Sequence, residues 1–228
     1  MTSTLSPSIL VVEPDPALAH TINLDLQEAG YNAVIVHDFR SGLQQVERLQ
    51  PSMTLIDRLL SHDSGIQLCQ QLRQNGYYKP VLLMMIRDAL EDRIACLEAG
   101  ADDYLLKPYR AEQFLQRIKF YLQPNVQTGE QLRFANLVLD LGGRRVYRNN
   151  EAIELTMKEF ELLKYLMEHP REVLTREQIL ENVWGYDFMG ESNVIEVYIR
   201  YLRLKIEADG DKRLIQTVRG VGYVLREA

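Results

Sequence analysis

Two charged residues at the ends of apolar runs are the residues of this sequence best placed to do chemistry. Asp57 ends the run Met53–Asp57, and Lys107 ends a second run that begins at Asp103. A continuous apolar run that stops at a charged residue is typical of a buried parallel strand, which delivers that side chain to the carboxyl edge of its sheet. Ligands of open α/β sheets bind at this edge. A carboxylate there could act as a nucleophile, with the lysine as a point charge for a phosphoryl group or another anion. A structural ion pair is the simpler alternative.

The pattern around these two residues predicts the fold that positions them. Short apolar runs alternate with segments of helical period throughout residues 1–123. This alternation predicts a doubly wound five-stranded parallel sheet, an α/β domain. The predicted strands are Ile9–Val12, Ala33–Val36, Met53–Ile56, Val81–Met85 and Tyr104–Leu106. The predicted helices are Ala17–Ala29, Ser41–Leu49, Ile66–Gln74, Ala89–Ala99 and Ala111–Leu122.

A different pattern predicts a second domain, of α+β type, over residues 131–228. The polar, turn-rich residues 124–130 predict a linker before it. Capping boxes at Thr156 and Thr175 predict the starts of two helices, and a third helix is predicted over Asn193–Ile206. Four predicted strands, Leu132–Phe134, Leu137–Leu141, Arg145–Arg148 and Ala152–Leu155, precede these helices. The chain ends in a predicted β-hairpin with the Gly-rich basic tip Arg219–Gly222.

Composition excludes several classes of protein. The chain has 228 residues, of which 46% are hydrophobic and 25% are charged, as in ordinary globular proteins. We find no run of roughly 18 apolar residues that could span a bilayer and no basic leader, so we expect a cytoplasmic protein without membrane contact. Cys69 and Cys96 fall in helical apolar patterns, which predicts buried thiols rather than metal ligands.

Charge is divided between the two predicted domains without making either one basic. Residues 1–123 carry 11 Lys+Arg and 15 Asp+Glu, net 11 − 15 = −4, and the remainder carries 15 and 17, net 15 − 17 = −2. The total of −6 argues against coating of nucleic acid by the whole surface, but it permits a local basic face.

Four stretches of the sequence resemble one family. They are Ile9–Glu13, Gly100–Tyr104 with Lys107–Pro108, Val183–Gly185 and Gln216–Tyr223. Over nearly its whole length the chain resembles the response regulators of the OmpR/PhoB type, in which a receiver domain precedes a winged-helix DNA-binding domain. The resemblance implies a transcription factor that binds double-stranded DNA and is controlled through its receiver.

The resemblance also assigns the chemistry of the receiver. It makes Asp57 the phosphoacceptor for a histidine kinase, Lys107 the phosphoryl-binding lysine and Tyr104 the aromatic switch. Met85 stands where the family has a Thr or Ser that bonds the phosphoryl group, and a thioether cannot donate a hydrogen bond. Ser61 replaces the customary Pro. We therefore expect an atypical receiver that acts with little or no phosphorylation of Asp57. The alternative is a conventional phosphorylation switch.

The metal site implied by the resemblance is also altered. Glu13 and Asp57 would hold Mg²⁺, a hard cation that needs several oxygen ligands. Pro14 stands where the family has a second acidic residue, so we expect weak binding. Asp15 could restore a carboxylate, or it could cap the helix that starts at Pro16.

The family dimerises through charged residues on one face of the receiver, and several stand at matching positions here. A solvated charged surface is the alternative, because one such pair contributes only about 0–1 kcal/mol. The predicted homodimer face consists of Arg93, Asp102, Asp103, Arg117 and Lys119.

The third helix and the hairpin of the second domain are the expected DNA interface. Arginines that face outward from a helix can bind guanine in the major groove, and the hairpin tip can place an arginine in the minor groove. Tyr201 stands where relatives often carry Arg. The predicted DNA-binding residues are Arg200, Arg203, Tyr198, Tyr201, Lys205, Thr217 and Arg219.

The resemblance implies that the loop before the third helix contacts RNA polymerase or partner subunits. Tyr186, Phe188 and Met189 would form an apolar patch there, although packing against their own domain is equally consistent with the sequence.

Two other classes of protein fit the sequence less well. A phosphohydrolase of the haloacid dehalogenase type would need an aspartate at Leu59. A nucleotide- or flavin-binding module would need a Gly-rich loop after the first strand, where Glu13–Pro16 would repel phosphate.

Overall fold

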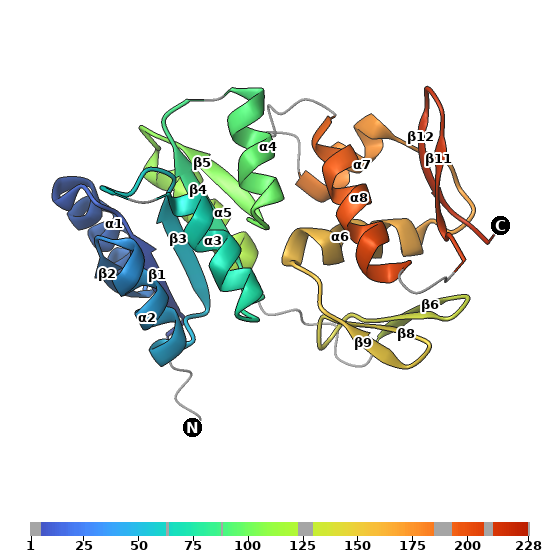
Figure 1. Cartoon of the computed structure of the whole chain (residues 1–228), viewed down its shortest axis with the longest axis horizontal. Helices are drawn as coiled ribbons and strands as arrows, with labels where there is room; N and C mark the ends of the chain where they lie inside the picture. Colours follow the sequence, from blue (N-terminus) through green and yellow to red (C-terminus); the bar gives the residue numbers. More distant parts are fainter. Residues whose placement is uncertain are drawn as a thin grey trace. The chain divides into compact units, whose positions relative to one another are not determined.

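The computed structural model describes residues 6–62, 64–87, 89–122, 130–184, 193–207 and 212–227. The chain divides into two compact units, Met1–Gln123 and Pro124–Ala228 (Figure 1). Of the predicted linker, residues 124–129 lie outside the described residues.

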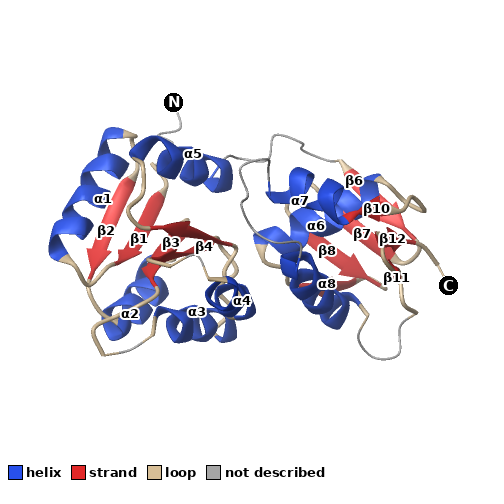
Figure 2. Ribbon diagram, turned by 90° about the horizontal axis from the view of Figure 1, so that it is seen from above, coloured by secondary structure: helices blue, strands red, loops and turns tan. Residues whose placement is uncertain are grey.

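The first unit is the predicted doubly wound sheet. Its strands are all parallel and lie in the order β2-β1-β3-β4-β5. Helices α1 and α5 cover one face of the sheet, and α2, α3 and α4 cover the other (Figure 2). The strands are β1 (Ser8–Val12), β2 (Asn32–Val36), β3 (Met53–Asp57), β4 (Val81–Met85) and β5 (Asp103–Leu106). The helices are α1 (Pro16–Glu28), α2 (Phe39–Leu49), α3 (Gly65–Gln74), α4 (Leu90–Glu98) and α5 (Ala111–Leu122).

Burial explains why β3 and β4 read as unbroken apolar runs. Both strands lie inside the sheet with helices on both faces, and every residue of both is buried. Gly65 lets α3 begin close to the end of β3, since a Cβ at this position would lie 1.9 Å from the Asp57 carbonyl oxygen. The absence of a side chain at Gly65 therefore helps to set the loop that follows Asp57.

Over its described residues, the second unit combines two antiparallel sheets with three helices, as the winged-helix prediction requires. One sheet has the order β6-β7-β8-β9 and the other β10-β12-β11. The strands are β6 (Gln131–Phe134), β7 (Leu137–Asp140), β8 (Arg145–Arg148), β9 (Glu151–Ile153), β10 (Leu174–Thr175), β11 (Ile215–Val218) and β12 (Gly222–Leu225). The helices are α6 (Met157–Glu168), α7 (Arg176–Trp184) and α8 (Asn193–Ile206).

Local sequence signals set the boundaries of these elements. Thr156 and Glu159 form the predicted capping box of α6, and the Gln178 side chain and backbone bond Thr175 in the same way before α7. Strand β10 was not predicted, because two residues carry no periodicity. It pairs with β12, where a Cβ on Gly222 would lie 1.9 Å from the Leu174 carbonyl oxygen.

Candidate functional site

Three charged side chains meet at the carboxyl edge of the first sheet. Glu13 follows β1, Asp57 ends β3 and Lys107 follows β5. Lys107 Nζ donates to Glu13 Oε2 at 2.9 Å and also to Asp57 Oδ2. The other carboxylate oxygens accept from backbone amides, Glu13 Oε1 from Asp15 at 3.0 Å and Asp57 Oδ1 from Leu59 at 2.8 Å. Asp57 and Lys107, which end two apolar runs of the sequence, are therefore in contact. Glu13 is the second carboxylate that Lys107 contacts.

Burial determines the electrostatics of this cluster. Glu13 is fully buried and Asp57 is 5% exposed. Burial raises the pKa of Glu13, and the Asp57 charge raises it further, against the Lys107 hydrogen bond. Burial alone would lower the pKa of Lys107, but its hydrogen bonds to Asp57 and Glu13 raise it above its ordinary value. The ammonium therefore stays charged at neutral pH and offsets one of the two carboxylates.

The same cluster offers few ligands for Mg²⁺. The Asp15 side chain caps α1 by accepting from the amides of Ala17 at 2.9 Å and Leu18 at 3.4 Å. Pro14 has no side-chain oxygen. In the parts of the chain that the structure describes, no three His, Cys, Asp or Glu side chains are grouped to hold a metal ion. Glu13 and Asp57 alone fit a cation that prefers six oxygens poorly.

We expect Mg²⁺ to bind the receiver with millimolar or weaker affinity, and Pro14→Asp to tighten binding by adding an oxygen ligand. Titration calorimetry of the full chain measures both values. Asp15→Ala is the matched control, because its carboxylate is already used by α1. Submillimolar binding that Asp15→Ala abolishes would contradict this account.

Met85 occupies the position where the family has a hydroxyl, and its side chain is buried. The Cys96 thiol of α4 donates to Met85 Sδ at 3.1 Å. Tyr104 on the neighbouring strand is 9% exposed, with the Arg93 guanidinium 5.9 Å from the centre of its ring. Met85 thus packs against α4 through sulfur and has no proton to donate toward Asp57.

An ion pair that was not predicted from the sequence links the residue after Asp57 to helix α4. Arg58, directly after Asp57, pairs with Asp92 at 2.6 Å, and Arg87 approaches the same carboxylate at 3.4 Å. No spacing rule relates residue 58 to residue 92, so only the fold reveals it.

We expect both cysteines to be unreactive in the folded protein. Cys69 and Cys96 are fully buried, and burial raises the pKa of each thiol to about 12. Both thiols therefore stay protonated and non-nucleophilic at neutral pH. A chromogenic disulfide reagent should label neither thiol in native buffer and both in guanidinium chloride. Rapid labelling of the native chain would contradict this.

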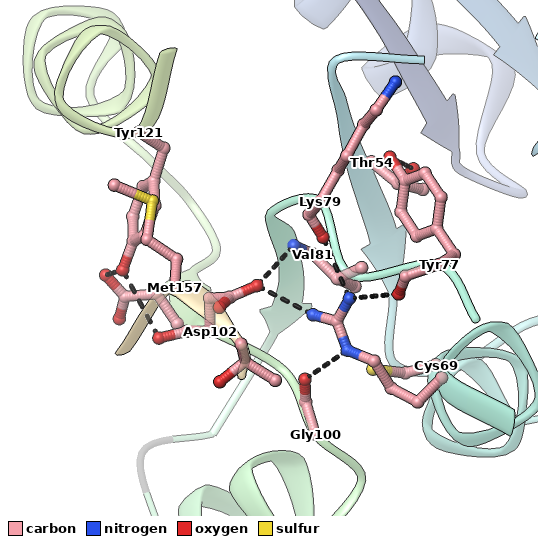
Figure 3. A network of polar contacts seen from close by, with 12 residues as sticks. Thr54, Cys69, Tyr77, Lys79, Val81, Gly100, Asp102, Tyr121 and Met157 are labelled. Atoms are coloured by element: carbon pink, nitrogen blue, oxygen red, sulfur yellow. Dashed lines mark hydrogen bonds and ion pairs between the residues drawn. The ribbon is translucent and has the colours of Figure 1, made fainter. Parts of the chain in front are cut away.

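Asp102, expected on the exposed dimer face, is instead buried. Its carboxylate accepts from Arg73 at 2.7 Å and from the Val81 amide at 2.8 Å (Figure 3). Arg73 also donates to the carbonyl oxygens of Gly100 and Tyr77. Asp102 therefore balances the enclosed Arg73 guanidinium inside the first unit.

The other members of the expected dimer face differ in exposure. Asp103 is 5% exposed and accepts from Arg117 at 2.7 Å and from the Tyr121 hydroxyl at 2.9 Å. Arg93 and Arg117 are partly exposed, and Lys119 is exposed.

In the second unit, α8 turns Arg200 outward and buries a residue expected to face DNA. Tyr198 is 4% exposed and packs against Trp184 with ring centres 5.0 Å apart. The exposed position expected for Tyr198 was therefore wrong, since it follows Val194 and precedes Leu202 at the four-residue spacing of the apolar face. Arg200 is exposed, and its guanidinium lies 5.1 Å from the centre of the Tyr201 ring.

Two basic residues of α8 are held by the protein itself. Lys205 donates to Glu159 Oε2 of α6 at 2.6 Å. Arg203 donates through Nε and Nη2 to the Ile215 carbonyl oxygen, at 3.1 and 2.9 Å, and through Nη2 to Thr217 Oγ1 at 2.9 Å. Burial and the Arg213 charge lower the pKa of Arg203. No sequence pattern predicts this contact between α8 and the hairpin.

Thr217 and Arg219 of the hairpin are both exposed. Residues 185–192, which include Tyr186, Phe188 and Met189, lie outside the described residues. Among the described helices, none is both long enough and apolar enough to cross a membrane.

The first unit brings an aspartate and a lysine together at the carboxyl edge of a parallel sheet, and the second unit is a winged helix. This combination defines the class of DNA-binding response regulators. Residues 9–119 match the family "Response regulator receiver domain", and residues 150–225 match "Transcriptional regulatory protein, C terminal". Response regulator MprA of Mycobacterium tuberculosis is 43% identical over 227 residues, which cover 98% of this chain and 99% of MprA.

Solved structures agree with this similarity. A mutant of RitR has a TM-score of 0.75 at 31% identity, covering 98% of this chain and all of that one. DrrB, an OmpR/PhoB homolog of Thermotoga maritima, has a TM-score of 0.53 at 29% identity, covering 97% of this chain and all of DrrB. This chain belongs to the response regulators of the OmpR/PhoB type.

Proposed function

We propose that this response regulator binds its DNA sites and controls transcription with little or no phosphorylation of Asp57. The single observation that carries the proposal is the Met85 side chain, which packs on Cys96 where the family has a hydroxyl for the phosphoryl group. Without that donor, a phosphoryl group on Asp57 has less differential affinity for the active state.

The free energy lost with this hydrogen bond can be compared with the free energy that a two-state switch requires. Moving a two-state equilibrium from 1:99 to 99:1 takes about 5.5 kcal/mol. One hydrogen bond to a charged group contributes roughly 1.5–3 kcal/mol. A phosphoryl signal reduced by that amount shifts the equilibrium only partly. The unmodified receiver must then already sample the active, dimeric state, and protein level or a partner that docks on the receiver sets the output.

The proposal includes the partners and residues that such a regulator needs. Double-stranded DNA would contact Arg200, Tyr201, Thr217 and Arg219 directly, with Arg203 and Lys205 holding their elements in place. A homodimer would use the receiver surface around Arg93, Arg117 and Lys119. RNA polymerase would contact the loop before α8. A histidine kinase, with weakly bound Mg²⁺, would phosphorylate Asp57 only inefficiently.

We expect Asp57→Ala to keep most DNA binding and most transcriptional output. The measurements are a mobility shift at equal protein concentrations, with and without acetyl phosphate and Mg²⁺, and a reporter in cells that lack the native chain. If the unmodified receiver already spends at least about a tenth of its time in the active state, acetyl phosphate should raise wild-type affinity by less than about tenfold. If Asp57→Ala abolished output while the protein stayed folded and abundant, the chain would be a phosphorylation switch.

A further inference from the structure

One exposed apolar residue of α8 has no role in the fold. Leu204 is 64% exposed, the most exposed large hydrophobic residue described in the second unit. The buried side of α8 is formed by other residues, such as Ile195, Ile199 and Leu202. Leu204 therefore adds little to the core of this unit.

The position of Leu204 on the helix indicates what it faces. Arg200 and Leu204 are four residues apart and share the outward face of α8. The preceding residue, Arg203, extends along the flank of the helix to the Ile215 carbonyl oxygen of β11. Leu204 thus lies on the outward ridge beside an exposed arginine, with the hairpin that carries Arg219 along one side.

We infer that Leu204 contacts the 5-methyl group of a thymine in the major groove and thereby selects a T·A pair. The inference rests on the DNA interface proposed above and names one determinant of its specificity. Among the four bases only thymine presents a methyl group in the major groove, and apolar side chains recognise it by contact. A leucine beside cations that bind phosphates or guanine fits that group and offers nothing to a hydrogen-bonding base edge.

The test removes only the methyl group from the DNA. The full chain first selects an operator from a random duplex library, and each thymine of that operator is then replaced singly by deoxyuridine, which keeps every hydrogen bond. Replacing one particular thymine per bound subunit should lower the affinity of the wild-type protein about fourfold. This is the factor that corresponds to the burial of one methyl-sized group. Leu204→Ala should bind the thymine and deoxyuridine duplexes equally at that position and keep the wild-type ratio elsewhere.

Val173→Ala is the matched control, since Val173 is another exposed apolar residue of the same unit, 40% exposed. It should keep the wild-type profile, and neither variant should change the unfolding midpoint. The inference is overturned if Leu204→Ala keeps the wild-type thymine-to-deoxyuridine ratio at every position, or if no position distinguishes the two bases in wild type. It is also overturned if Leu204→Ala only weakens cooperativity between two bound copies.

Failure of the proposed interface gives a different result. Arg200→Ala and Arg219→Ala would then bind the selected operator as tightly as wild type, while the deoxyuridine profile would still report on Leu204. If wild type enriched no sequence at all, both the interface and the role of Leu204 would be rejected.

Discussion

Asp102→Ala is expected to lower the free energy of unfolding of the first unit by about 3–5 kcal/mol, because it leaves a buried guanidinium without its counter-ion. The Asp102 side chain is fully buried and that of Arg73 is 10% exposed. The variant also removes the acceptor of the Val81 amide at the start of β4. The loss should therefore spread into the strands that position Asp57 and Lys107.

Each unit can be followed separately in the full chain. Trp184 is the one tryptophan of the sequence, so its fluorescence reports the second unit, and hydrogen exchange of β4 and β5 amides reports the first. Urea should unfold β4 and β5 earlier in Asp102→Ala while the Trp184 transition stays in place.

Two further variants calibrate the effect. Asp102→Asn keeps the shape of the side chain and one acceptor oxygen, so its free energy of unfolding should fall less than that of Asp102→Ala. Asp15→Ala removes an exposed cap of α1 and should cost only about 0.5–2 kcal/mol. Stability of Asp102→Ala within about 1 kcal/mol of wild type would show that Arg73 finds water or another acceptor instead.

The course of the backbone followed from the sequence because its signals are local. Apolar runs predicted β3 and β4, and the Thr156 capping box predicted the start of α6. The meeting of Asp57 and Lys107 also followed, because parallel strands end at a common edge. These predictions needed only periodicity and the rules of parallel sheets.

The partners of individual charged side chains could not be predicted in the same way. The partner of Asp102 could not be predicted because Arg73 lies 29 positions away, on helix α3. Tyr198 looked like a DNA contact because its hydroxyl is polar, although its helical position is on the apolar face. Long side chains contact residues of other helices and strands, and these contacts cannot be predicted from the spacing of residues in the sequence.

Arg203 shows the functional consequence of such a contact. The sequence places it among the residues that could bind guanine in the major groove. The structure uses its donors on Ile215 and Thr217, and its guanidinium lies 5.9 Å from the centre of the Tyr223 ring of β12. Arg203 therefore fixes the hairpin against α8.

We expect Arg203→Ala to weaken binding to a selected operator by roughly 1–3 kcal/mol, the range seen for a specific contact. Unlike loss of a base-reading residue, it should weaken binding equally on every single-base variant of that operator, because the hairpin and α8 can no longer bind DNA as one rigid surface. Mobility shifts on the full set of variants measure this pattern.

Arg200→Ala and Arg226→Ala are the comparison variants. Arg200 is exposed on α8, so its removal should relax preference at one base pair. The Arg226 side chain donates through Nε to Gln216 Oε1 of the same hairpin at 2.7 Å, so its removal should leave affinity nearly unchanged. Hydrogen exchange of β11 amides should speed up in Arg203→Ala alone. If the affinity loss in Arg203→Ala were instead confined to one base pair, with β11 exchange unchanged, Arg203 would swing away from Ile215 in the complex and read that base directly.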